Sequence, residues 1–118
     1  MTATLGSTSF NGNNCVFGIS GGALSIWGFT GSGVTPVLPY IELSILNYTA
    51  GATGTYTISD TSVNVIAAID SAGAGGAAAA YGTITITSAS ASAVSGTFSF
   101  TTDDSTKVSN GKFTAKLN

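Results

Sequence analysis

Hydrophobic and polar residues alternate with a period of two along most of the chain. In the segment 82–88, Ile84 and Ile86 point to one side and three threonines point to the other. This is the period of a half-buried β-strand, in which successive side chains lie on opposite faces. Apolar residues nowhere recur at helical spacing over the length of a helix, so the pattern predicts an all-β fold.

The alternation predicts about eight or nine strands joined by short turns. The predicted strands are a short one within 5–10 and the segments 14–20, 23–30, 40–47, 54–59, 63–69, 82–88, 94–101 and 107–117. Short polar connectors join the last three, which predicts a C-terminal three-stranded antiparallel meander. This strand number and turn spacing are typical of an antiparallel β-sandwich or a small barrel, in a single domain over 1–118.

Two segments are predicted to lie outside the strands. Pro36 and Pro39 bracket the segment 35–39, and proline has no amide hydrogen for a central strand. The segment 71–80 consists almost entirely of Gly and Ala. Alanine favours a helix, but this run is too short to nucleate one behind its glycines, so we expect a loop of small residues.

Charged residues are scarce: three lysines and five acidic residues make up 7% of the 118 residues, whereas about 25% is typical. Histidine and arginine are absent from the sequence. Without histidine the chain has no Ser-His-Asp or Cys-His catalytic unit and no imidazole metal ligand. With a net charge of -2, it lacks the positive charge that binds nucleic acid. We expect no catalytic residue, no metal site, no cofactor and no nucleic-acid partner.

The acidic residues leave two weaker alternatives, a catalytic carboxylate pair and a Ca²⁺ site. The acidic residues are Glu42, Asp60, Asp70, Asp103 and Asp104. Catalysis by a carboxylate pair would need two of them within about 10 Å of each other. Asp103 and Asp104 could also contribute to a Ca²⁺ site, since this cation takes carboxylate oxygens. Adjacent acids in a hairpin turn are more often solvated, so we expect no metal site there. Because no catalytic unit is expected either, we predict a protein that is not an enzyme.

The compartment is indicated only by composition. No apolar stretch approaches the ~20 residues of a membrane-spanning helix, and the first residues carry no export signal. Cys15 is the only cysteine, and we expect it to be buried in a strand. Scarce charge with abundant Thr, Ser and Gly is typical of exported bacterial surface proteins, which predicts an extracytoplasmic domain, at the cell surface or secreted.

Aromatic residues are the candidate ligand-binding residues: Trp27, Tyr40, Tyr48 and Tyr81. In the segment 23–30, Leu24 and Ile26 point one way while Trp27 and Phe29 point the other, so both faces are partly apolar. Aromatic faces on a sheet stack on sugar rings or are buried in a protein interface. The sequence leaves open whether Trp27 belongs to the core or to such a surface, whose partner would be a surface glycan or protein.

Self-assembly is the alternative function. Strands of Thr and Ser carry little of the charge that normally blocks pairing between sheet edges. Apolar residues on both faces of 23–30 would be covered by a neighbouring subunit. The chain would then be a structural subunit of a fibre, shell or other homo-oligomer. Its interface would lie on the strands between 14 and 58, where Glu42 is the one charged residue.

The order of segments supports a family comparison. The segments concerned are 2–4, 9–12, 23–28, 41–45, 54–58, 82–87, 94–101 and 108–113. Together they resemble an uncharacterised family of small exported or lipid-anchored all-β domains common in Bacteroidetes, a domain of unknown function. The resemblance implies export and an all-β fold, and it implies no catalytic residue. Family members usually begin with a lipidated cysteine, a role that does not suit Cys15 inside a predicted strand.

Overall fold

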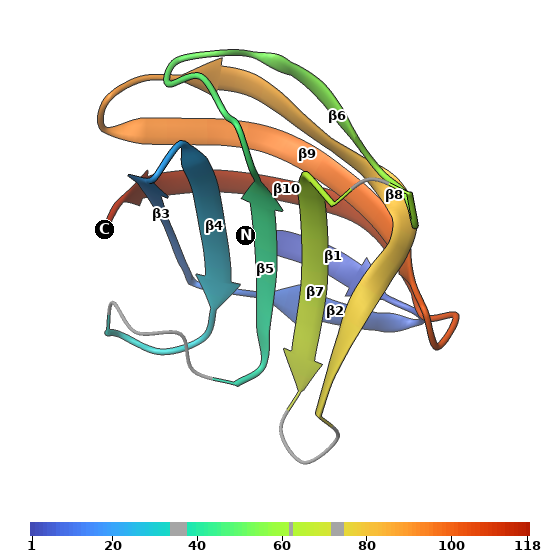
Figure 1. The fold of residues 1–118 in the computed structure, drawn as a ribbon. Coiled ribbons are helices and arrows are strands. Elements are labelled where there is room, and N and C mark those ends of the chain that lie inside the picture. Colours follow the sequence, from blue (N-terminus) through green and yellow to red (C-terminus); the bar gives the residue numbers. More distant parts are fainter. Residues whose placement is uncertain (34–37, 62, 72–74) are drawn as a thin grey trace.

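The structure, a computed structural model, describes residues 1–33, 38–61, 63–71 and 75–118 (Figure 1). These residues form ten strands and no helix, which confirms the all-β prediction with more strands than expected. The strands are β1 (Thr2–Leu5), β2 (Thr8–Asn11), β3 (Asn14–Ser20), β4 (Ala23–Phe29), β5 (Tyr40–Ile45), β6 (Gly54–Ile58), β7 (Val65–Ser71), β8 (Gly75–Ala89), β9 (Ala93–Thr102) and β10 (Lys107–Leu117).

Seven of the strands close into a barrel in the order β3, β4, β5, β7, β8, β9, β10 and back to β3. The predicted meander is confirmed, since β9 pairs antiparallel with both β8 and β10. The wholly antiparallel sandwich is wrong, because β10 pairs with β3 in parallel through Lys116 with Val16 and Leu117 with Phe17. This parallel contact closes the sheet on itself, so the small-barrel alternative describes the fold.

The length of β8 and β10 explains why strands are left over outside the barrel. Residues 75–78 of β8 pair with β7, and residues 82–86 of the same edge pair with β6. In the same way, β10 pairs with β1 over its first half and with β3 at its end. Each long strand therefore offers one edge to two partners, and β1, β2 and β6 extend the sheet beyond the closed ring.

The loop expected over 71–80 is wrong in its second part. Residues 75–80 begin β8, where Ala77 and Ala78 pair with Ile69 and Ala68 of β7. Hydrogen bonds to neighbouring strands thus outweigh the intrinsic helix preference of alanine. Residues 72–74 lie outside the described residues, as do 35–37 of the other expected loop, and Pro39 lies just before β5.

The core lies between two layers of the barrel. Figure 1 shows β3, β4, β5 and β7 side by side, with β9 and β10 crossing above and behind them; β8 runs beside β7 and curves over to join β9. Residues at most 1% exposed between these layers include Phe17, Leu24, Ile26, Ile41, Leu43, Ile84 and Ile86. Cys15 is also buried on β3, as predicted. The described part of the chain contains no helix long and apolar enough to cross a membrane.

Candidate functional site

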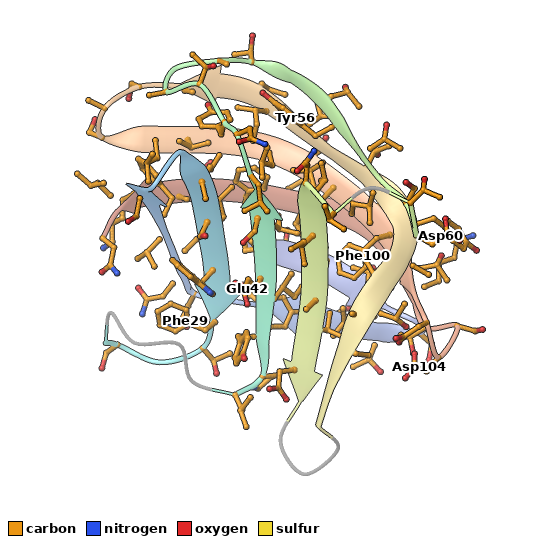
Figure 2. The ribbon with its side chains drawn as sticks, in the orientation of Figure 1. Phe29, Glu42, Tyr56, Asp60, Phe100 and Asp104 are labelled. Atoms are coloured by element: carbon orange, nitrogen blue, oxygen red, sulfur yellow. The ribbon has the colours of Figure 1, made fainter. Side chains whose placement is uncertain are left out.

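The outward face of β4, β5 and β7 carries aromatic and acidic residues in adjacent rows. Trp27 lies directly opposite Glu42 on β5, and Tyr40 lies directly opposite Asp70 on β7. Ile26 adjoins Trp27 in the chain, and Ile41 adjoins both Tyr40 and Glu42; both isoleucines are buried in the core, so these three side chains point away from it. Asp70 shares their face through its pairing with Tyr40. Each of the four is half-buried. We call Trp27, Tyr40, Glu42 and Asp70 the outer-face patch; Figure 2 shows Glu42 on β5, in the middle of this layer.

The two aromatic residues of the outer-face patch are diagonal neighbours. Tyr40 precedes Glu42 by two residues on β5, so it shares a face with the residue opposite Trp27. Diagonal neighbours on paired strands lie roughly 7–8 Å apart, within reach for aromatic side chains. The register of β4 against β5 therefore places an indole and a phenol side by side on one surface.

Two serines orient the carboxylate of the patch. The hydroxyl of Ser44 donates to Oε1 of Glu42 at 3.5 Å. The Ser44 and Ser25 hydroxyl oxygens lie 3.2 Å apart in a further hydrogen bond across β4 and β5. Because Ser44 is almost fully buried, it holds this side of Glu42 against the sheet. The other oxygen atom of the carboxylate has no such contact among the hydrogen bonds of the described residues and can accept from a ligand.

Tyr40 and Asp70 influence each other electrostatically. The pKa of Tyr40 is raised above its ordinary value of 10.0, first by burial and then by the negative charges of Asp70 and Glu42. Each of these factors disfavours the phenolate. The phenol of Tyr40 therefore stays protonated to a higher pH than an ordinary tyrosine, as a hydrogen-bond donor beside two carboxylates.

The structure separates the other two candidate residues from the outer-face patch. Tyr48 is only 6% exposed and belongs to the core. Its hydroxyl donates to the carbonyl oxygen of Ala52 at 2.6 Å, and its ring centroid lies 6.2 Å from that of Tyr56. Tyr81 is 61% exposed on β8, where it borders a shallow depression with Lys107. Of the four predicted residues, only Trp27 and Tyr40 come together.

One pocket brings two acidic residues to the same place. Asp70 and Asp104 both line a pocket of about 310 Å³, together with Tyr40 and Thr106. The pKa of Asp104 is lowered, chiefly by hydrogen bonds from the hydroxyl of Thr102 and from Thr106. The amide of Thr106 donates to Oδ1 of Asp104 at 3.2 Å. Asp104 is thus held as a carboxylate that closes the turn between β9 and β10.

The acidic residues that the structure describes do not gather into a metal site. Among the residues that the structure describes, no three His, Cys, Asp or Glu side chains gather into a group that could hold a metal ion. Asp103 and Asp104 are exposed at the tip of their turn, and Figure 2 shows Asp104 at the edge of the molecule. The geometry of the turn is explained by hydrogen bonds within it.

Comparison with known proteins identifies no relative of the chain. No family model, no curated protein and no solved structure matches the chain. The resemblance to the Bacteroidetes domains rests on the segments quoted above and stays a prediction.

Proposed function

We propose that the protein is a non-enzymatic extracytoplasmic domain that binds a neutral glycan at the bacterial cell surface through the outer-face patch. The observation that carries this proposal is the pairing of Trp27 with Glu42 and of Tyr40 with Asp70 on one face of neighbouring strands. It joins two aromatic rings to two hydrogen-bonding carboxylates on a rigid sheet.

The chemistry of this surface matches a sugar ring. The aromatic faces of Trp27 and Tyr40 cover the apolar C–H face of a pyranose, while their polar edges stay in water. The carboxylates of Glu42 and Asp70 accept hydrogen bonds from sugar hydroxyls, and charge-assisted hydrogen bonds are the stronger kind. The same negative charges repel sulfated or carboxylated sugars, so the ligand class is a neutral glycan.

The extracytoplasmic location is supported by composition and by the resemblance. Only 7% of the residues are charged, and the first half of the chain depends on Thr, Ser and Asn for its polar surface. Such a surface suits a domain that is displayed, anchored or covered by a partner. The resemblance to exported Bacteroidetes domains points the same way.

A glycan array with the whole chain tests the proposal. We expect the unchanged protein to bind neutral oligosaccharides on the array. In calorimetry with one of these oligosaccharides, Trp27→Ala and Tyr40→Ala should each bind at least tenfold more weakly than the unchanged protein. The matched control is Tyr81→Ala, which removes an exposed tyrosine from β8 and should bind normally. Failure to bind any glycan, or a loss of binding in Tyr81→Ala with retention in Trp27→Ala, overturns the proposal; binding to a protein partner through Trp27 instead would overturn the glycan assignment.

Self-assembly is the second candidate, and the edges of the sheet favour it. The strands β2 and β6 are the two ends of the strand order. Within the described residues neither has a second strand partner, and neither contains a charged residue or a proline. Natural sheets usually protect such edges with charge or proline. In this account β6 of one copy pairs with β2 of the next.

Sedimentation velocity distinguishes the assembly. Pairing through edges predicts oligomers at micromolar concentration, and Thr57→Lys on β6 should dissociate them because it adds charge to the edge. Thr87→Lys, at an exposed position on the interior strand β8, is the matched control and should leave them intact. A stable monomer at every concentration contradicts the assembly without affecting the glycan proposal.

A further inference from the structure

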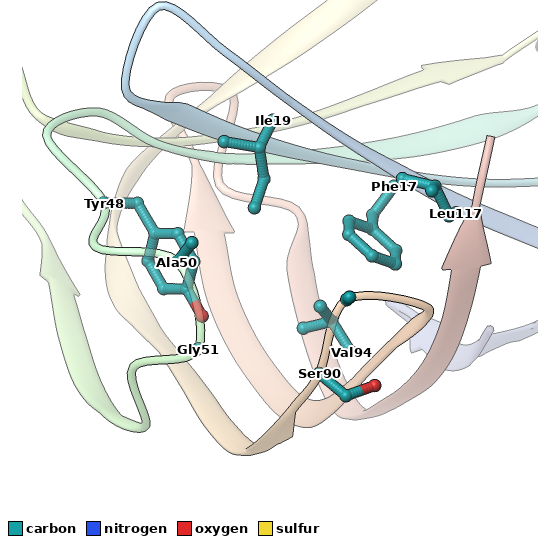
Figure 3. Close-up of a pocket in the computed structure, with 9 residues that line it drawn as sticks. Phe17, Ile19, Tyr48, Ala50, Gly51, Ser90, Val94 and Leu117 are labelled. Atoms are coloured by element: carbon teal, nitrogen blue, oxygen red, sulfur yellow. The ribbon is translucent and has the colours of Figure 1, made fainter.

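A second pocket lies at one mouth of the barrel, away from the outer-face patch. It has a volume of about 310 Å³, and its walls include Phe17 and Ile19 from β3, Tyr48 and Ala50 from the segment after β5, Val94 from β9 and Leu117 from β10. Figure 3 shows Tyr48 and Phe17 on opposite sides of the opening, with Ile19 between them at its upper edge.

The inner walls of this mouth pocket are fixed by packing and by one hydrogen bond. Phe17 and Val94 are each 1% exposed, so the packing of the barrel fixes their side chains. The ring of Tyr48 is held by the hydrogen bond from its hydroxyl to the carbonyl oxygen of Ala52. With its hydroxyl bonded, Tyr48, which is 6% exposed, lines the pocket as part of its wall. The pocket is therefore formed before a ligand arrives, which lowers the cost of ordering on binding.

The lining offers little to a polar ligand. Among the residues that the structure describes, no charged side chain borders the mouth pocket. Two of its lining side chains carry a hydroxyl, Tyr48 and Ser90. Ser90 Oγ accepts from the amides of Ala93 at 3.1 Å and Ser92 at 3.3 Å, and it donates to the carbonyl oxygen of Ala93 at 3.2 Å. These bonds stabilise the turn between β8 and β9. A ligand here meets apolar surface.

We propose that the mouth pocket binds an uncharged apolar molecule of one or two rings. Mouths of β-barrels are favoured ligand sites, and such sites begin at about 300 Å³. A cavity of roughly 150 Å³ holds benzene, so this larger and partly open pocket has room for a second ring. Phe17 and Tyr48 flank the ligand, and Ile19 and Leu117, which are 42% and 56% exposed, cover it at the rim.

Fluorescence titration with N-phenylnaphthylamine, an uncharged apolar probe of two linked ring systems, tests this site. We expect saturable enhancement with one probe for each chain. Ile19→Asp places a charge at the rim, where the side chain is already partly in water, and should weaken binding at least tenfold. The matched control is Ile66→Asp, at a 44% exposed position on β7 outside the pocket, and it should bind as the unchanged protein does.

Two further variants keep the test decisive if Ile19→Asp is destabilised. Ala50→Trp adds a large side chain at an exposed position of the rim and should block the probe while circular dichroism stays unchanged. Tyr48→Phe keeps the ring and should keep binding within about threefold. The proposal is overturned if enhancement is absent or does not saturate, if Ile66→Asp loses as much binding as Ile19→Asp, or if the rim is covered by a second copy that Ile19→Asp dissociates.

Discussion

Trp27 on β4 lies directly opposite Glu42 on β5, on the face of the sheet that points away from the core. One carboxylate oxygen of Glu42 accepts from Ser44, which is itself bonded to Ser25. The serines hold the carboxylate beside the indole without neutralising it. This relationship is the basis of the proposed glycan site, since it combines a stacking surface with an oriented acceptor.

Replacing Glu42 by glutamine should weaken glycan binding. The amide keeps the shape of the side chain and one acceptor, but it loses the charge that strengthens hydrogen bonds from sugar hydroxyls. Hydrogen bonds to charged groups contribute about 1.5–3 kcal/mol, and we expect Glu42→Gln to lose roughly tenfold in affinity by calorimetry. Asp60→Asn removes an exposed acid after β6 and serves as the control. Equal losses in both variants would show an effect of net charge rather than of this site.

Replacing Asp70 by asparagine should lower the pKa of Tyr40. Burial and the charge of Asp70 both raise this pKa, and only the second is removed, so it should fall toward but not below 10.0. Because the folded-state pKa is raised, the contribution of Tyr40 to stability is complete below about pH 10 and is lost as pH rises through the folded-state value. NMR of the labelled phenol carbon measures the shift. An unchanged pKa in Asp70→Asn would contradict the contact across β5 and β7.

Replacing Gly96 by alanine should destabilise the barrel. A Cβ at this buried position on β9 would collide with the carbonyl oxygen of Thr85 and lie 2.8 Å from the ring of Phe113. Such overpacking costs roughly 1–3 kcal/mol, occasionally more, which urea denaturation measures. In Gly18→Ala on β3, the added Cβ meets no atom of the described residues within 4 Å, so the free energy of unfolding should change by less than about 0.5 kcal/mol. Similar losses in the two variants would refute the packing of β8, β9 and β10.

Asp104 should contribute to acid denaturation. Hydrogen bonds from Thr102 and Thr106 lower its pKa below the ordinary value of 3.8. The folded chain therefore binds fewer protons than the unfolded chain, and the stabilisation is present above about pH 4 and lost as pH falls through the folded-state pKa. Asp104→Asn should show a smaller loss of stability between about pH 5 and pH 2 in urea titrations.

The control for this acid dependence is the neighbouring residue. Asp103→Asn changes the same turn, but the hydrogen bonds from Thr102 and Thr106 go to Asp104. The acid dependence should therefore persist in Asp103→Asn. If both variants flatten it equally, the overall charge of the turn is responsible instead of the bonded carboxylate.

The strands were predictable where their pairing is local. Between residues 82 and 117, short connectors bring each strand back onto the preceding one, so the alternation of Ile84, Ile86 and Phe98 was enough to predict the meander. The closure of the barrel depends on β3 and β10, where Lys116 meets Val16. That contact joins distant parts of the chain through only two residue pairs. The local alternation of residues does not predict such a pairing.

The candidate site was predictable only in part, for the same reason. Alternation placed Trp27 on the face opposite Leu24 and Ile26 but left open whether that face is core or surface. The register between β4 and β5 decides that Trp27 and Tyr40 are neighbours. The role of Asp70 depends on the pairing of β5 with β7, two strands separated by β6 in the chain. Tyr48 follows β5 in a turn where no periodicity applies, so only the structure shows that its side chain is buried and bonded to Ala52.

Trp27 is the only tryptophan of the chain, so its fluorescence reports directly on the outer-face patch. The decisive measurement is a titration of the unchanged protein with a neutral oligosaccharide selected on the array. Stacking of a sugar removes the indole from water, and the account predicts a saturable emission shift to shorter wavelength with the dissociation constant found by calorimetry. Calorimetric binding of that oligosaccharide with unchanged Trp27 emission would contradict it.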